Sequence, residues 1–295
     1  MGAGRASQRH RMKIRVALAL ACASVAVLAA GQGPTFRSGV DLVEVYVTVL
    51  DAGGAPVTGL TRDDFVLLED GESQTIQTFT EGAFPVSVAI GIDRSASMAG
   101  SKLALAKRAT TRFLESLEST DRSVVFAIGA EPELVAPATA TRAAQVRAVE
   151  ALDAWSTTAL YDGLATMLNA MAEEPGRNAV VVFSDGVDRY SRTTAAAALD
   201  QARHSRALIY PIAIGRIRPP VLAEIAAASG GRSLQVRDVA ALAPALDGIA
   251  RELHHQYLLG YTPMPGPAGW RAIRVRLASP RPGIRVRARD GYVAD

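Results

Sequence analysis

The chain has 295 residues, of which 49% are apolar, so it can bury a substantial core as one large domain or two smaller ones. Five of its 32 basic side chains lie in residues 1–31, which hold no acidic residue, and the remainder carries 27 basic against 29 acidic side chains, a formal charge of −2. This balance gives no support to a nucleic-acid partner, and we expect none.

Residues 1–31 have the pattern of a secretory signal peptide. A basic start ends at Arg15, an apolar run extends from Val16 to Ala30, and small residues lead up to a cleavage point near Gly31. The run is shorter than the roughly 20 residues that a membrane-spanning helix needs, and an uncleaved amino-terminal anchor is the alternative. We therefore expect an exported protein in the periplasm or at the cell surface. Its mature form lacks cysteine, because Cys22 lies inside the run.

The segment 36–83 is expected to be β structure. Apolar and polar residues alternate over 42–50, and a turn signal follows at 51–54. Two further strands are expected at 65–68 and 75–79, with a turn signal between them.

From residue 84 to residue 255 the pattern changes to strands that alternate with helices. Strands are expected at 85–92, 122–128, 178–184 and 207–214. Helices are expected at 102–117, 141–151, 159–172, 193–205, 221–228 and 240–255. The run 179–183 is continuously apolar, as a strand covered on both sides should be. The alternation predicts an α/β fold, a doubly wound and mainly parallel sheet with helices on both faces.

The segment 256–295 returns to β character, with strands expected at 257–261, 273–277 and 284–287. Both ends of the mature chain are therefore β, and the middle is α/β. We expect the α/β domain to be inserted into a smaller β-sandwich that 36–83 and 256–295 form together.

The candidate site consists of oxygen-bearing side chains on three loops. Asp93, Ser95 and Ser97 follow the strand 85–92, Thr158 begins a helix, and Asp185 follows the strand 178–184. The carboxyl ends of parallel strands share one edge of the sheet, where ligands bind. An all-oxygen set with two carboxylates suits a hard divalent cation, Mg²⁺ first and Mn²⁺ or Ca²⁺ as alternatives. The two serines would bind it directly, and the other three side chains directly or through water.

Each of these elements also has a simpler interpretation. Thr158 is of the type that caps a helix, residues 184–186 could be an ordinary turn, and the loop at Asp93 could cap the helix near Lys102. The common order and the shared sheet edge favour the metal site.

The pattern of Asp93, Ser95, Ser97, Thr158 and Asp185 resembles the metal-ion-dependent adhesion site of von Willebrand factor type A domains. The resemblance covers about residues 84–255, and the flanking segments are similar to bacterial exported proteins related to that domain. It implies that a protein partner completes the coordination with an acidic residue. Ala96 and the pair Ser156-Thr157 replace glycines that are common in the family, which leaves the path of the second loop open.

Other motifs are weaker. Neither serine lies in a Gly-x-Ser-x-Gly elbow, so we expect no enzyme. The pair at 254–255 lies at an expected helix end, where the helix dipole favours a cation, and this explains it better than a zinc site. The region Arg271–Arg289 holds seven arginines and no acid. It is either a solvated sheet face that discourages edge pairing or a contact for an anionic envelope surface.

The sequence therefore predicts an exported, metal-dependent protein-binding module of the adhesion type. Two alternatives stay open. One is a hydrolase that uses the same metal to activate water. The other is a structural subunit of an envelope assembly, in which the metal only stabilises the fold.

Overall fold

The fold is taken from a computed structural model, which describes residues 42–82, 84–174, 176–185, 188–216, 218–237 and 239–294. The predicted signal peptide at 1–31 lies outside the described residues. The part of the chain from Leu42 onward forms one compact unit, and three sheets account for its strands.

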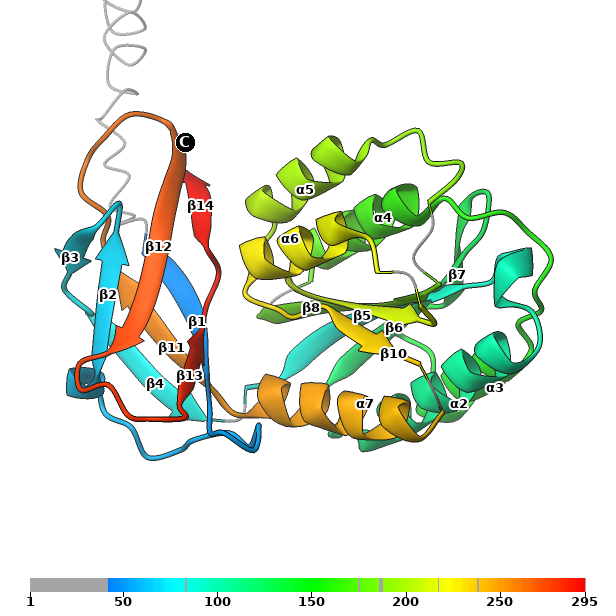
Figure 1. Ribbon diagram of the computed structural model, residues 1–295, viewed down its shortest axis with the longest axis horizontal. Helices are drawn as coiled ribbons and strands as arrows, with labels where there is room; N and C mark the ends of the chain where they lie inside the picture. The colour runs from blue at the N-terminus through cyan, green and yellow to red at the C-terminus, as the bar shows by residue number, and fades with distance from the viewer. Residues whose placement is uncertain are drawn as a thin grey trace, which may run out of the picture. The chain divides into compact units, whose positions relative to one another are not determined.

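A six-stranded sheet forms the centre of the α/β part (Figure 1). Its strands, in spatial order, are β10 (Leu234–Val236), β9 (Leu208–Ile214), β8 (Arg177–Ser184), β5 (Val86–Asp93), β6 (Arg122–Ile128) and β7 (Pro132–Ala136). All neighbours run parallel except β7, which is antiparallel to β6. The doubly wound, mainly parallel sheet is therefore confirmed. The short strands β7 and β10 lie at its edges and were not predicted from the sequence.

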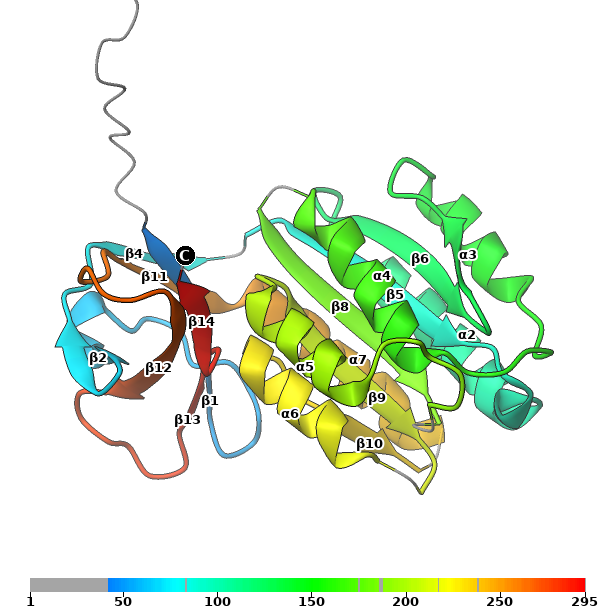
Figure 2. The ribbon, with the colours of Figure 1, turned by 90° about the horizontal axis from the view of Figure 1, so that it is seen from above.

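Helices cover both faces of this sheet, as Figure 1 shows edge-on. One face carries α2 (Ser101–Ser116), α3 (Arg142–Glu150) and α7 (Val239–His254). The other carries α4 (Leu160–Ala172), α5 (Ala195–His204) and α6 (Pro220–Ser229), and Figure 2 looks onto that side. Every residue of β5, β8 and β9 is buried, because helices cover both of their faces. Each face has its own apolar core cluster, and the sheet separates them.

The two remaining sheets are antiparallel and have four strands each. In one, the spatial order is β13 (Arg285–Arg287), β1 (Val43–Leu50), β11 (Gln256–Tyr261) and β4 (Thr78–Gly82). In the other, it is β14 (Gly291–Ala294), β12 (Gly269–Leu277), β2 (Phe65–Glu69) and β3 (Glu72–Gln74). Alternate residues of these strands share one buried cluster that includes Val47, Leu67 and Leu259. Strands from both ends of the described chain thus pair with one another, and the limits 36–83, 84–255 and 256–295 stay a prediction.

The predicted strand at 75–79 is wrong for residues 75–77, and its last two residues begin β4. The chain instead leaves β3 at Gln74 and enters β4 at Thr78, and these two strands belong to different sheets. Residues 75–77 therefore cross between the sheets, and Ile76 is buried in the shared core. The apolar residue in this segment is therefore a buried crossing residue and not part of a continuous strand.

Candidate metal-binding site

The site lies where the winding of the central sheet reverses. β5 and β8 are parallel neighbours, and the chain continues from β5 to β6 on one side and from β8 to β9 on the other. Loops that leave two such strands diverge, and this leaves a crevice outside their carboxyl ends. Asp93 is the last residue of β5, and Asp185 directly follows the last residue of β8.

The first loop is organised by the Asp93 carboxylate, which is fully buried. Its Oδ1 accepts a hydrogen bond from the Ser95 amide at 2.8 Å, and its Oδ2 accepts one from the Ser184 hydroxyl at 2.7 Å. The hydroxyl oxygens of Ser95 and Ser97 lie 3.1 Å apart. The loop therefore brings three of the predicted ligands together, with Ser95 buried and Ser97 open to solvent.

The electrostatics of the two carboxylates favour added positive charge. Burial raises the pKa of Asp93, hydrogen bonds from Ser184 and Ser95 oppose that rise, and the negative charge of Asp185 adds to it. The net result is a pKa above the usual range for an aspartate. A divalent cation between the two groups would lower the pKa of Asp93, because a nearby positive charge stabilises the ionised carboxylate.

Asp185 has one oxygen engaged and one free. The Lys102 ammonium donates to its Oδ2 at 3.1 Å and to the Ser97 carbonyl at 3.0 Å. The Oδ1 atom is buried and has no hydrogen-bond partner among the described residues. A buried carboxylate oxygen without a partner is costly, so this atom fits a further cation.

Thr158 is buried and does not cap the helix that it precedes. The N-cap of α4 is Ala159, and the Asp188 carboxylate accepts from the first amide of α4, that of Leu160, at 2.7 Å. The helix near Lys102 likewise has Gly100 as its N-cap, without a side-chain cap. The simpler capping interpretations of Thr158 and of the Asp93 loop are therefore wrong.

Backbone contacts hold the second loop against the first. Ser95 and Ser156 form an isolated parallel bridge, and the Ala96 amide donates to the Ser156 carbonyl at 2.7 Å. The Ser156 hydroxyl accepts from the Ala130 amide at 2.9 Å, so this residue has a structural role where glycine is common. Thr158 follows Ser156 by two residues, so these contacts place the segment that carries Thr158 next to the first loop. In the part of the chain that the structure describes, no hydrogen bond joins the Thr158 hydroxyl to the other four side chains.

Three supporting residues were not singled out from the sequence. Lys102 contacts Asp185, Ser184 contacts Asp93, and Asp188 positions the start of α4. Ser184 and Asp188 lie within three residues of Asp185, at the end of an expected strand. This position could have indicated from the sequence that they support the site. Lys102 carried no signal, because a lysine in the first turn of a helix is ordinary.

The histidines near the end of α7 have structural partners. His254 Nε2 lies 2.8 Å from Asp121 Oδ2, and His255 Nδ1 lies 2.9 Å from the Arg251 carbonyl. Asp121 also accepts from the Val86 amide, so the pair ties the end of α7 to the start of β5. No group of three or more His, Cys, Asp or Glu suited to a metal is found among the described residues. The structural interpretation of these histidines is the better one.

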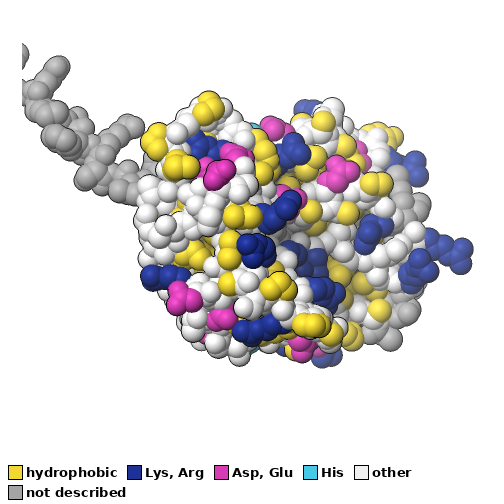
Figure 3. Space-filling view, turned by 60° about the vertical axis from the view of Figure 1, so that its left-hand side comes forward, with side chains coloured by type: hydrophobic (Ala, Val, Ile, Leu, Met, Phe, Trp, Pro, Cys, Tyr) yellow, Lys and Arg dark blue, Asp and Glu magenta, His cyan; other side chains and the backbone are white. Residues whose placement is uncertain are grey.

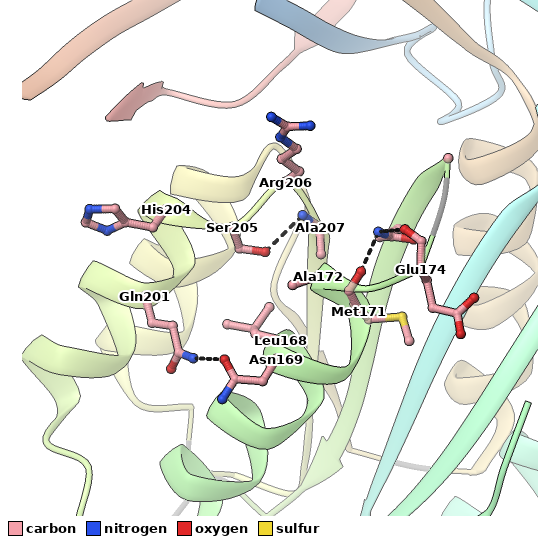
Figure 4. Close-up of a pocket in the computed structure, with 12 residues that line it drawn as sticks. Leu168, Asn169, Met171, Ala172, Glu174, Gln201, His204, Ser205, Arg206 and Ala207 are labelled. Carbon is pink, nitrogen blue, oxygen red and sulfur yellow. Dashed lines mark hydrogen bonds between the residues drawn. The ribbon is translucent and has the colours of Figure 1, made fainter. Parts of the chain in front are cut away.

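A cleft of about 430 Å³ lies at the opposite edge of the sheet, where α4 and α5 end (Figure 4). Gln201 donates to the Asn169 side chain across it at 2.9 Å, and the side-chain amide of Asn178 donates to the Met171 carbonyl. The Ser205 hydroxyl accepts from the Ala207 amide, so it is held by its own loop. The described lining brings together neither a nucleophile with a base nor a set of metal ligands.

The arginines of the carboxyl-terminal region are partly neutralised. Arg271 pairs with Glu69, Arg281 with Asp64, and Arg287 with Glu252. Arg274, Arg276 and Arg285 are exposed. Figure 3 shows basic side chains gathered near the middle of one face, with acidic side chains among them. The pairing favours a solvated and ion-paired sheet face over a strongly basic one.

The fold and the loop cluster define an α/β domain whose candidate site lies at the switch point of its sheet. The family described as von Willebrand factor type A domain matches residues 88–187. This part of the chain therefore has the fold that its motif resembles, and the resemblance is confirmed at that level.

Solved structures agree with this fold. A von Willebrand factor type A protein from Catenulispora acidiphila is 18% identical, with a TM-score of 0.54, over 88% of this chain and 76% of that chain. The vWF domain of the type V pili tip protein Mfa5 from Porphyromonas gingivalis is 15% identical, with a TM-score of 0.50, over 57% and 95%. Proximal thread matrix protein 1 from the mussel byssus, with a zinc-occupied MIDAS motif, is 14% identical, with a TM-score of 0.52, over 63% and 49%.

A search of curated protein sequences finds no match. Within the described residues, no helix has both the length and the apolar character needed to cross a membrane.

Proposed function

We propose that this protein is an exported binding module that holds a divalent cation with Asp93, Ser95, Ser97, Thr158 and Asp185. The observation that carries the proposal is the buried Oδ1 of Asp185, which has no hydrogen-bond partner in the described part of the chain, while the other oxygen of that carboxylate faces the Lys102 ammonium. The donor set, two carboxylates and three hydroxyls, suits Mg²⁺, and Mn²⁺ or Ca²⁺ are alternatives.

When bound, the cation would supply an open coordination position with net positive character. The protein's own residues prepare that position: Asp93 is fixed by Ser184 and by the Ser95 amide, and the Ser97 hydroxyl faces solvent. An acidic residue of a partner protein is the group that such a position attracts. This would be binding without turnover, because the carboxylates near the two serines, Asp93 and Asp185, are assigned to the cation and are not free to act as a base.

The names of two solved neighbours support a binding role. One is a pilus tip protein, and another is a matrix protein with zinc at the corresponding motif. Zinc therefore belongs in the set of ions to test here.

The experiment is titration calorimetry of Mg²⁺, Mn²⁺, Ca²⁺ and Zn²⁺ into the wild type and into Asp93→Asn, which keeps the size of the side chain. We expect saturable 1:1 binding that the variant loses. Arg108→Gln on the exposed face of α2 is the control for a general change in charge. No binding by the wild type, or equal binding by Asp93→Asn, would refute the proposed site. Release of product from a hydrolysable ester or phosphate in the presence of metal would instead favour the hydrolase alternative.

Export is proposed from the pattern of residues 1–31. Amino-terminal sequencing of protein recovered from the cell envelope should begin near Gln32. Recovery of protein that begins at Met1 from the envelope would support a retained anchor, and recovery from the cytoplasm would refute export.

A further inference from the structure

Two large aromatic side chains stand exposed beside the proposed metal site. Trp155 is 67% exposed and Tyr190 is 66% exposed. Exposed apolar surface that gathers beside one site is typical of an interaction surface, and Trp and Tyr are among the residues most enriched at interaction hot spots. Among the described residues, Trp270 is the third exposed ring of this kind, and it lies on β12, where the Arg203 guanidinium sits 5.3 Å from its centroid.

Each ring is tied by its backbone to a loop of the site. The Trp155 amide donates to the carbonyl of Arg94, the residue between Asp93 and Ser95, at 3.2 Å. The Tyr190 amide donates to the carbonyl of Thr158 at 3.1 Å. The two rings therefore border the site on two different loops, and both are positioned by residues that belong to it or adjoin it.

The guanidinium of Arg94 packs over the Trp155 ring and holds it in place. The Arg94 guanidinium lies 4.7 Å from its centroid, and the same guanidinium pairs with Glu133 at 2.7 Å. A cation–π contact of this kind contributes about 0.5–1 kcal/mol at an exposed site. A ring that is already fixed loses little conformational entropy when it is covered, which is the property of a good anchor.

The exposed charges next to Tyr190 in the sequence are positive, whereas the nearby Asp188 carboxylate is half-buried and accepts from the Leu160 amide. Arg189 and Arg192 are both exposed, and each lies within two residues of Tyr190. Together with a cation between Asp93 and Asp185, they make that side of the site complementary to an acidic ligand.

We propose that Trp155 and Tyr190 are the apolar anchors of the binding surface, and that the surface takes an acidic peptide segment of a partner protein. The proposal rests on the proposed function. In it, one acidic residue of the segment reaches the cation, and large apolar side chains of the same segment, one or two positions away, cover the two rings. Further acidic residues of the segment face Arg189 and Arg192.

The test uses a display library of seven-residue peptides with a central aspartate or glutamate and random flanks. It is selected against the full protein with saturating Mg²⁺ and again with chelator. We expect metal-dependent binders enriched in aromatic or large aliphatic residues within two positions of the acid. Synthetic copies of them should bind Trp155→Ser and Tyr190→Ser about tenfold more weakly than the wild type.

The controls separate this inference from the proposed function. Mg²⁺ affinity should be unchanged in both variants, since neither side chain is a proposed ligand. Trp270→Ser should bind the peptides like the wild type, and Trp155→Phe should recover most of the loss. If Mg²⁺ binds but no metal-dependent peptide is selected, or the selected peptides bind both variants normally, the proposed surface is wrong. If Mg²⁺ itself does not bind, the proposed function fails first.

Discussion

The ammonium of Lys102 lies 3.1 Å from Asp185 Oδ2, so one oxygen of this proposed metal ligand already faces a positive charge. The contact is local to the site, because the same ammonium also donates to the Ser97 carbonyl at 3.0 Å. Asp93 and Asp185 are both buried, and the repulsion between them contributes to the raised pKa of Asp93. Lys102 supplies one positive charge beside this pair. A divalent cation has to compete with this charge.

Replacing Lys102 with Met should tighten divalent cation binding. The substitution removes a unit charge that repels the incoming ion and occupies Asp185, while it keeps an unbranched apolar stem. A charge pair at about 4 Å is worth about 1 kcal/mol even at the dielectric constant of water, so affinity should rise at least about fivefold. Titration calorimetry with Mg²⁺ measures this, with Arg108→Met on the same helix as the matched control. Unchanged or weaker binding by Lys102→Met would show that the ammonium does not compete for the site.

Asp185→Ala should weaken cation binding much more than Ser97→Ala. The first removes one of two charged ligands, and the second removes a single neutral oxygen that is already exposed. We expect a loss of more than about a hundredfold for Asp185→Ala and about tenfold for Ser97→Ala, by analogy with the cost of removing groups around a metal. Both variants should keep the wild-type circular dichroism spectrum. Equal losses in the two variants would contradict the assigned roles.

Stability should fall at alkaline pH in part through Tyr257. Burial raises its pKa to about 12, the hydrogen bond from the Leu60 amide lowers it, and the charge of Glu81 raises it. The unfolded value is about 10, so the folded state holds the proton more tightly. The stabilising contribution is complete below about pH 10 and is lost as pH rises through about 12, by up to 1.4 kcal/mol per pH unit.

Tyr257→Phe should therefore unfold at lower urea concentration near neutral pH, because it loses the hydrogen bond to the Val57 carbonyl, and should depend less on pH above 10. Urea unfolding followed by circular dichroism from pH 8 to pH 11.5 tests this. A variant whose stability falls as steeply with pH as that of the wild type would assign the effect to other groups. Tyr210 and Tyr261 also have raised pKa values through burial, so some slope should remain.

Ending the chain after Glu252 should expose the amino-terminal strands. β1 lies between β11 and β13, and β2 pairs with β12, so the truncation removes both neighbours of β1 and one of the two neighbours of β2. Unpaired strands with exposed apolar faces are not stable on their own. Hydrogen exchange should show faster exchange in 43–50 and 65–69 but continued protection in β5 and β8. Equal protection of β1 and β2 in the truncated protein would refute the idea of a shared sandwich.

Periodicity was sufficient for the four inner strands of the central sheet and for the described α-helices. The apolar runs of β5, β8 and β9 have no polar alternation, because helices cover both faces, and this pattern needs no knowledge of distant partners. The edge strand β7 has a mostly exposed pattern, and β10 has only three residues, so neither has a periodic signal of its own. The strand expected at 75–79 failed for a related reason, since Ile76 is buried between two sheets that the sequence does not separate.

The sequence by itself determined the oxygen-bearing residues, their order along the chain and the class of fold that places them at one sheet edge. Their chemistry is local: Asp93, Ser95 and Ser97 lie on one loop, and residue type and spacing are visible in any sequence. The tertiary structure decided which oxygens have partners. Asp185 meets Lys102 across 83 positions, and Ser184 meets Asp93 across 91, because parallel strands bring the ends of distant segments together. Contacts of that kind depend on how the sheet is wound, and no local pattern in the chain encodes them.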